Sequence, residues 1–489
     1  MLQNEVYERA RLARDARFDG QFYVGVKTTG IYCRPICPAN APKSENVAFY
    51  PSAAAAGEAG FRPCLRCRPE CAPGTPAWSG TSTTVRRGLR LISGGALDDG
   101  SVESLADRLG VTSRHLRRLF SKHLGASPLA VAHTQRLHFA KRLIDETTLP
   151  MRHISSAAGY GSIRRFNDAF QRTYGRPPRE LRRAGEESEL AGSKASLTVR
   201  LPYRLPFDWQ GMLTFFAGRA TPGVELVSEQ SYRRTLSTNG DHGIVEIRPD
   251  SRDGYLSLTL ASVNTNSLFE TVQSAREVFD LDAPVGEIGM TLGRDKALRK
   301  LSRSFPGIRV PGAWDGFELT IRAILGQQIS VKAATTIAGR IATRYGEPLK
   351  LDTDQNQSEL SRIFPTPERL ARARLNNLGL VTSRAKTIRG VAKAVLLGDV
   401  HFDAAQDPVE FCDSLKSVRG IGDWTAQYVA MRVLKNPDAF PASDLGLIKA
   451  VRYPDRVTPK ELETLAEEWR PWRAYAAMLL WSSLPGSGG

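Results

Sequence analysis

The chain of 489 residues has no run of about 18 consecutive apolar residues, which excludes a helix that crosses a membrane. Its first residues, Met1 to Glu5, lack the apolar stretch of a secretory signal peptide. Cysteine is scarce, with six in the whole chain, and in the cytoplasm such thiols stay reduced and free to bind metal. We therefore expect a cytoplasmic protein with no membrane partner.

Basic residues are abundant and unevenly distributed. Lysine and arginine number 67 against 51 acidic residues, a formal net charge of +16, which suggests a polyanionic partner. Between Ser82 and Ala184 there are 19 basic and 8 acidic residues, and nearly all of the basic ones are arginine. A charge run is usually only a solvated face, but a surplus this concentrated favours contacts with phosphates.

The basic segment 82–184 contains an internal repeat with an offset of 49 to 50 residues. Each copy has an apolar residue, a glycine and a serine, followed by a phenylalanine, a second glycine and a proline. The matching residues are Leu105 and Ile154, Gly110 and Gly159, Ser113 and Ser162, Phe120 and Phe170, Gly125 and Gly175, and Pro128 and Pro178.

Each copy predicts a short helix, a turn at glycine, and an arginine-rich helix that Ser113 or Ser162 caps. Two helix-turn-helix units would place their second helices in successive major grooves of DNA. The segment resembles the DNA-binding domain of AraC-type transcription regulators; the alternative is a helical bundle with a basic face. The outward-facing residues expected to touch bases or phosphates are Arg114, Arg117, Arg164 and Arg165.

Four of the cysteines form two closely spaced pairs near the N-terminus. Cys33 and Cys37 have the spacing C-x3-C, and Cys64 and Cys67, after 26 intervening residues, have the spacing C-x2-C. Each pair can present two thiolates, and two pairs complete a tetrahedral Zn²⁺ shell. The alternative is ordinary reduced cysteines, but two such pairs rarely lie this close together, so we predict one zinc site.

Residues 1–78 resemble the N-terminal domain of the adaptive-response protein Ada. The resemblance rests on three stretches, Lys27 to Cys37, Glu45 to Tyr50 and Ala59 to Cys64. It implies that Cys33 takes a methyl group from a methylphosphotriester in DNA, and a zinc-bound thiolate is the appropriate nucleophile. A purely structural zinc knuckle is the alternative. We expect nearby arginines to hold phosphate, namely Arg34, with Arg62 and Arg66.

The second half of the chain differs in character. Residues 185–196 are polar and form a candidate linker. Residues 197–285 carry alternating strand-like runs, such as Tyr255 to Leu260, and predict a small α+β unit. From residue 286 to residue 489 the periodicity is helical.

A glycine-containing turn near residue 420 predicts a contact with DNA phosphate. Gly420 and Gly422 allow a tight turn whose N–H groups face outward, and a helix is expected to begin near Asp423. Such a turn is the hairpin of helix-hairpin-helix proteins. On its own the pattern is weak, since any interhelical turn can contain it.

Asp444 lies 22 residues beyond Gly422, room for one helix and a loop that return its carboxylate to the hairpin side. An Asp that precedes a helix is most often an N-cap. However, the region from Pro202 to Trp481 resembles the DNA-3-methyladenine glycosylase II (AlkA) family. That resemblance implies a catalytic Asp444. The matching stretches include residues 324–330, 364–367 and 470–475.

The resemblance implies hydrolysis of the N-glycosidic bond of an alkylated purine. A carboxylate stabilises the oxocarbenium charge that develops on the sugar, while the flipped cationic base stacks on aromatic rings. The alternative is that these rings only belong to the core. The expected pocket residues are Phe215, Trp424, Tyr428 and Trp481.

Three departures from related families narrow the chemistry. Trp424 stands where lyase-type glycosylases have a Schiff-base lysine, so a monofunctional enzyme is expected. Cys412 is alone in its region, which excludes an iron–sulfur cluster. In the AlkA family an apolar side chain usually fills the space that the flipped base leaves in the duplex. Gln328 stands at the matching position, and its neighbour Ile329 is an alternative apolar side chain for this role.

Together these patterns predict a multidomain, mainly helical protein: an α+β zinc domain (1–78), a double helix-turn-helix domain (82–184), and an α+β unit followed by a helix-hairpin-helix glycosylase domain. Ada's own C-terminal methyltransferase has no counterpart. The expected partners are alkylated and promoter DNA and RNA polymerase, in a bacterial nucleoid. The rival hypothesis is a non-enzymatic regulator whose second half is an inactive DNA clamp.

Overall fold

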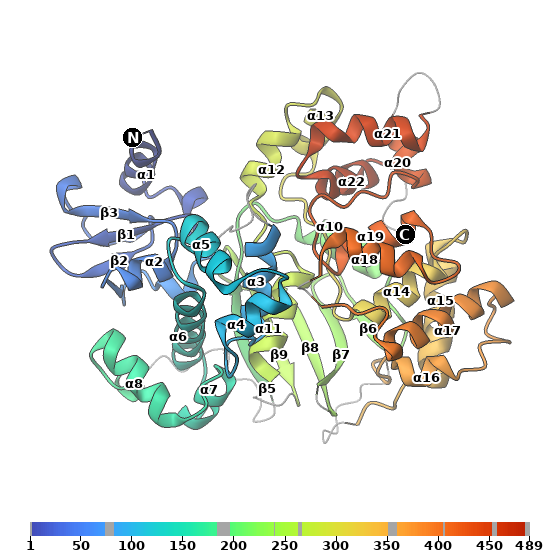
Figure 1. Ribbon diagram of the computed structural model, residues 1–489, viewed down its shortest axis with the longest axis horizontal. Coiled ribbons are helices and arrows are strands. Elements are labelled where there is room, and N and C mark those ends of the chain that lie inside the picture. Colours follow the sequence, from blue (N-terminus) through green and yellow to red (C-terminus); the bar gives the residue numbers. More distant parts are fainter. Residues whose placement is uncertain are drawn as a thin grey trace.

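The computed structural model describes residues 2–73, 83–182, 196–238, 240–262, 267–350, 359–403, 406–451 and 457–484. The predicted linker 185–196 lies outside these residues except for Ser196, where a strand begins. The mainly helical, multidomain fold class is confirmed, with two small sheets among many helices (Figure 1). No helix in the described part of the chain is both long and apolar enough to cross a membrane.

The N-terminal body is a four-stranded sheet with short helices beside it. The sheet order is β3-β1-β2-β4, and β2 and β4 are parallel, which brings the two cysteine pairs to neighbouring strands. The elements are α1 (Leu2–Leu12), β1 (Tyr23–Val26), β2 (Ile31–Cys33), β3 (Val47–Tyr50), α2 (Ala53–Glu58) and β4 (Arg62–Pro63).

The second body is all helical and contains the predicted repeat. Leu105 and Ile154, on the first helix of each copy, are fully buried. Gly125 and Gly175 end the second helices with positive φ angles of 66° and 68°, which glycine adopts without strain. The helices are α3 (Thr83–Ser93), α4 (Val102–Arg108), α5 (Ser113–Leu124), α6 (Pro128–Glu146), α7 (Met151–Ala157), α8 (Ile163–Tyr174) and α9 (Pro178–Leu181).

The third body is the predicted α+β unit. Its antiparallel sheet has the order β5-β9-β8-β7-β6, and the run Tyr255 to Leu260 lies in β9 as expected. The elements are β5 (Ser196–Pro202), α10 (Trp209–Ala217), β6 (Glu225–Val227), β7 (Tyr232–Thr238), β8 (Asp241–Pro249), β9 (Tyr255–Ala261) and α11 (Leu268–Val278).

The fourth body is helical in its described residues, apart from isolated β-bridges, and has a large core of its own. Its helices are α12 (Val285–Leu292), α13 (Lys296–Ser304), α14 (Gly316–Leu325), α15 (Val331–Tyr345), α16 (Pro367–Ala371), α17 (Thr382–Leu397), α18 (Pro408–Lys416), α19 (Asp423–Arg432), α20 (Leu445–Ala450), α21 (Pro459–Ala466) and α22 (Arg473–Ser482).

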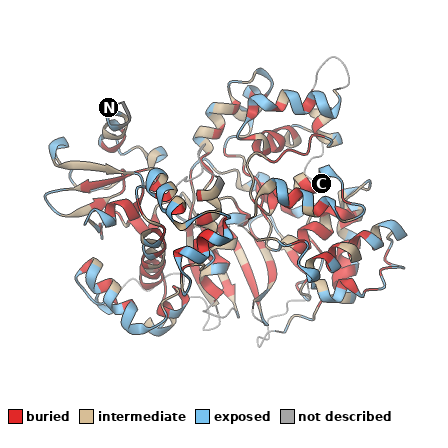
Figure 2. Cartoon of the chain, viewed as in Figure 1, coloured by how far each residue is buried: buried red, intermediate tan, exposed pale blue. Residues whose placement is uncertain are grey.

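Helix α6 joins the bodies to one another. It packs against the zinc-domain helix α2, lies between the two helix-turn-helix units, and contacts β5 (Figure 1). The Phe139 ring lies 4.7 Å from that of Phe269 on α11, edge to face. As a result one continuous core contains residues of α6, α8 and the sheet β5–β9, and Figure 2 shows much of α6 and of this sheet in red, the colour of buried residues.

The imidazole of His138, on α6, faces the zinc domain and is partly buried. Burial, with help from Arg142 and Lys141, lowers the pKa of His138 to about 4, so the ring is neutral near pH 7. Its Nε2 lies 2.8 Å from the hydroxyl of Tyr32, the residue before Cys33.

The shared core predicts that Phe139→Ala will destabilise both halves of the chain. Phe139 is 3% exposed, and loss of its ring is expected to cost about 3–5 kcal/mol through lost burial and a cavity. Calorimetry should show lower melting temperatures for the regulator and glycosylase transitions. Leu129→Ala, on the same helix but 45% exposed, should leave both nearly unchanged. An equal loss in the two variants would contradict the shared core.

Candidate functional sites

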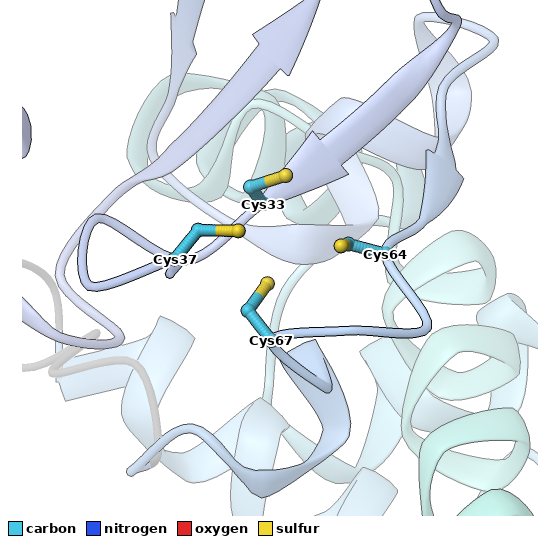
Figure 3. A group of neighbouring side chains, drawn as sticks. All are labelled: Cys33, Cys37, Cys64 and Cys67. Carbon is cyan, nitrogen blue, oxygen red and sulfur yellow. The ribbon is translucent and has the colours of Figure 1, made fainter. Parts of the chain in front are cut away.

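The four predicted cysteines form one cluster at the ends of β2 and β4. All four Sγ atoms lie within 4.8 Å of one another, and Figure 3 shows the sulfurs pointing toward a common centre. Such a set of four thiol groups fits tetrahedral zinc. The parallel pairing positions it, because the amide N of Cys64 donates to the carbonyl of Tyr32 at 3.0 Å.

The four sulfurs differ in exposure and in hydrogen bonding. Cys33 and Cys37 are partly exposed, whereas Cys64 and Cys67 are buried. The Sγ of Cys67 accepts the backbone N–H of Arg34 at 3.3 Å. Cys33 interacts with the three other sulfurs. Because an N–H donor stabilises the thiolate charge, it makes its sulfur a weaker nucleophile.

The structure contradicts the expected phosphate contact of Arg34. The residue is 9% exposed, its guanidinium binds both carboxylate oxygens of Asp19, and its Nη1 donates to the carbonyl of Cys67 at 3.2 Å. Arg34 therefore connects Cys67 to Asp19 in the interior of the zinc domain and stabilises the cysteine cluster. Arg62 and Arg66 are exposed and remain available for phosphate.

Both arginine-rich helices are present, and each carries an exposed face, drawn pale blue in Figure 2. Ser162 caps α8 as predicted, but the expected cap at Ser113 is wrong by one residue, since Thr112 caps α5. Arg117 forms an exposed ion pair with Glu103 at 2.9 Å, which is worth little and is easily exchanged for phosphate. The four exposed arginines are Arg114, Arg117, Arg164 and Arg165.

The predicted hairpin connects α18 to α19, which begins at Asp423 as expected. Gly420 has φ +97°, and a Cβ there would lie 2.1 Å from Thr387 Oγ1 on α17. Gly422 is exposed and has no atom within 4 Å of an added Cβ. Gly420 is thus required by the protein's own packing, whereas the space around Gly422 is open.

Asp444 is brought to the hairpin side by α19 and the loop that follows. Its Oδ2 accepts the indole N–H of Trp424 at 2.8 Å, and its Oδ1 accepts that of Trp481 at 2.9 Å. Oδ1 also accepts the backbone N–H of Leu447 at 2.9 Å, so Asp444 is the N-cap of α20. Three N–H donors therefore orient a partly buried carboxylate.

The expected pocket residues come together from α10, α19 and α22. The rings of Trp424 and Tyr428 are stacked at 5.3 Å with an interplanar angle of 7°, and Tyr428 lies 6.4 Å from Trp481. Arg432 lies between Phe215 and these rings: its guanidinium is 5.0 Å from the centre of the Phe215 ring and 5.4 Å from the centre of the Tyr428 ring.

Two arginines in this group were missed by the sequence reasoning. Arg219 covers Phe215 at 4.0 Å, and Arg432 donates to the Tyr428 hydroxyl at 2.8 Å. Burial raises the pKa of Tyr428, but the cations of Arg432 and Arg219 outweigh it and the net pKa is lowered. The position of Arg432, four residues after Tyr428 on one helix face, was a usable signal.

Gln328 lies in a strained turn, and its neighbour Gln327 is hydrogen-bonded to the hairpin at Gly420 and to Thr425. The φ of Gln328, +57°, is left-handed, which is uncommon for a residue other than glycine. Its neighbour Gln327 donates to Gly420 O at 3.2 Å and to Thr425 Oγ1 at 3.0 Å, and Arg384 donates to the carbonyl of Gln327. The turn and the hairpin therefore form one unit.

Comparison with known families divides the chain in the same way. Residues 7–70 match the metal binding domain of Ada, and 105–184 match a helix-turn-helix domain. Residues 198–315 match the AlkA N-terminal domain, and 321–473 match the HhH-GPD superfamily of base excision DNA repair proteins.

One relative combines all of these parts. A probable bifunctional transcriptional activator/DNA repair enzyme AlkA of Mycobacterium tuberculosis is 40% identical over 479 residues, 97% of this chain and 95% of its own length. The chain belongs to this AlkA family of bifunctional regulator and repair proteins. The prediction of an Ada-type zinc domain, a helix-turn-helix domain and an AlkA-type glycosylase is confirmed.

More distant relatives each match one part of this AlkA-family chain. DNA-3-methyladenine glycosylase 2 of Escherichia coli is 36% identical over 58% of this chain and 95% of its own. The Escherichia coli enzyme Ada is 35% identical over 36% of this chain and 48% of its own. A 3-methyladenine DNA-glycosylase structure from Archaeoglobus fulgidus has a TM-score of 0.51 at 24% identity over 57% of this chain and 96% of its own, which shows the shared fold.

The hairpin geometry predicts opposite outcomes for its two glycines. Gly420→Ala forces a side chain into a left-handed backbone and against Thr387, so we expect a loss of about 1–3 kcal/mol of stability. Gly422→Ala meets no protein atom and should melt like the wild type. Thermal unfolding of the two variants compares them. A normal melting temperature for Gly420→Ala would contradict the packing role assigned to that glycine.

Proposed function

We propose that this protein repairs alkylated DNA with its second half and senses alkylated DNA with its first. The glycosylase releases N-alkylated purines of the 3-methyladenine type, and the zinc domain accepts methyl groups from backbone phosphotriesters. The observation that carries the proposal is the position of Asp444, held by two indole N–H groups among aromatic rings and next to a hairpin.

Base excision follows from the charge that Asp444 presents. As the glycosidic bond breaks, its electron pair moves to the purine nitrogen and neutralises the cation that N-alkylation created. The sugar becomes an oxocarbenium ion, which the carboxylate of Asp444 stabilises. Water then adds to the sugar carbon and its proton passes to the carboxylate or to solvent. Trp424 stands where a Schiff-base lysine would be needed, so the product is an abasic site.

Methyl transfer uses the cysteine cluster. Bound zinc keeps the thiolates deprotonated at neutral pH. Cys33 Sγ attacks the methyl carbon, the S–C bond forms as the C–O bond breaks, and the electron pair stays on phosphate, which becomes an ordinary diester. The partial exposure of Cys33, in contrast to buried Cys64 and to Cys67, which is buried and accepts the N–H of Arg34, supports Cys33 as the nucleophile.

The two activities share an electrostatic link to DNA. Four thiolates around Zn²⁺ carry a formal charge of −2, and a thioether at Cys33 reduces it to −1. Repulsion from the phosphate backbone then falls, so affinity for promoter DNA rises. The exposed arginines of α5 and α8 supply the DNA contacts. RNA polymerase is the proposed partner at the promoter, and the bacterial nucleoid is the proposed location.

The rival function is a regulator whose second half is an inactive DNA clamp. A clamp needs only the hairpin and its phosphate contact. It does not need a carboxylate aligned by two indoles, because a helix cap requires only the backbone N–H of Leu447. The indole donors therefore favour the enzyme.

Asp444→Asn is expected to slow release of 3-methyladenine at least about 100-fold, because the transition-state cation loses its carboxylate. The amide oxygen can still cap α20, so the fold and binding to undamaged duplex should persist. Single-turnover release from alkylated duplex and a DNA-binding titration measure the two effects.

Asp413→Asn is the matched control for this variant. Asp413 is an exposed carboxylate on α18, paired with Lys416 at 2.9 Å, and it makes the same charge change outside the site. It should excise at the wild-type rate. Retained excision by Asp444→Asn would refute the assigned role, and loss in both variants would show a general effect of charge.

Cys33 is expected to be the one ligand that gains a methyl group. Incubation of the zinc-loaded protein with DNA that carries methylphosphotriesters should produce S-methylcysteine at position 33, which peptide mass spectrometry locates. Methyl on Cys37 or Cys64 instead would refute the choice. The same duplex without phosphotriesters controls for other sources of methyl.

A further inference from the structure

The two residues that flank Cys33 connect the zinc domain to the rest of the protein: Tyr32 through His138, and Arg34 through Asp19 and Arg204. Tyr32 is 2% exposed, and its hydroxyl lies 2.8 Å from His138 Nε2 on α6. On the other side, Arg34 binds the carboxylate of Asp19, and the carbonyl of Asp19 accepts Arg204 Nη1 at 3.1 Å. Arg204 follows β5 of the glycosylase half.

Cys33 is thus bracketed by one contact to the regulator helix, through Tyr32, and one to the glycosylase half, through Arg34, Asp19 and Arg204.

Helix α6, which carries His138, also contacts the glycosylase half at α11 and at strand β5. Phe139, next to His138, packs on Phe269 of α11. Arg142 donates to the carbonyl of Arg200, and Glu146 accepts the N–H of Arg200 at 3.1 Å. Both backbone groups of a residue on the edge strand β5 are therefore satisfied by α6, which protects that edge from solvent.

Methylation of Cys33 changes charge and volume at the centre of this junction. Arg34 faces the cluster closely: its backbone N donates to Cys67 Sγ at 3.3 Å and its Nη1 donates to Cys67 O at 3.2 Å. Loss of one negative charge weakens the attraction that holds this cation, and burial leaves that attraction little screened. The added methyl group also enlarges a partly exposed side chain whose sulfur lies within 4.8 Å of the three other cysteine sulfurs.

We propose that the glycosylase half reads the methylation state of Cys33 through Tyr32–His138 and Arg34–Asp19–Arg204. Methylation loosens the junction at β5, and because the α+β unit also carries Phe215 on α10, looser docking makes the base pocket less preorganised and slows excision. One molecule would then act mainly in repair before methylation and mainly as a regulator after it. The inference rests on Cys33 being the acceptor.

Hydrogen–deuterium exchange of the full-length, zinc-loaded protein tests the proposal. The protein is methylated with phosphotriester DNA, freed of DNA in high salt, and compared with protein treated with unmethylated duplex. Exchange in peptides that cover 196–202 should accelerate about fivefold or more, while peptides from α15 stay unchanged. Single-turnover excision should slow by a similar factor.

Variants show whether the proposed contacts transmit the effect. Tyr32→Phe with Arg204→Gln removes both connections, and methylation should then leave exchange in 196–202 unchanged. Arg108→Gln is the matched control. It breaks another contact between the halves, Arg108 to Asp403 at 2.8 Å, that does not lead to Cys33, so the response should persist.

The outcomes separate the two proposals. Failure to find methyl at Cys33 by mass spectrometry would overturn the acceptor assignment. Confirmed methylation with unchanged exchange at 196–202, or an unchanged excision rate, would overturn the coupling alone. An undiminished response in the double variant would overturn the route assigned to it.

Discussion

The burial of α6 is the constraint on which the arrangement of the whole chain depends. One helix fills the helix-turn-helix core, packs on the zinc domain, and satisfies both backbone groups of Arg200 on an edge strand. An edge strand with unpaired groups is prone to pair with other chains, and α6 covers this edge at Arg200. The fusion has therefore made the regulator a structural part of the enzyme, beyond a tether through a linker.

Asp444 shows how one geometry serves stability and chemistry together. As an N-cap it places its Oδ1 against the first turn of α20, and that constraint fixes the direction of the whole carboxylate. The indoles of Trp424 and Trp481 then add donors that a cap does not require. The cap and catalytic interpretations of Asp444 are thus compatible, since the helix supplies the rigidity that a transition-state contact needs.

Local patterns carried most of what the sequence could predict. The cysteine spacing, the glycine-punctuated repeat and the hairpin each depend on residues close together in the chain, and each is found as expected. Arg34 was misplaced because its partner Asp19 lies 15 residues away in the chain, and no local pattern shows that the pair is buried. Arg432 was missed because its contact with Phe215 forms only when α10 meets α19, whereas Arg219 lies four residues after Phe215 and its local contact was overlooked. The docking by α6 likewise left no periodic signal.

The missed arginines change how the aromatic pocket must work. Both guanidiniums lie over the Phe215 ring, and Arg432 also lies over Tyr428, so the protein's own cations already use faces that would attract a cationic base. A charged purine that enters must stack on surface left by Trp424 and Trp481, or it must displace a cation held by three hydrogen bonds, since Arg432 also donates to the carbonyls of Pro311 and Gly312. The second route is the costlier one, because it leaves buried polar groups unpaired. The indoles orient Asp444 through their N–H groups, and in the proposed mechanism they also offer the base their remaining faces.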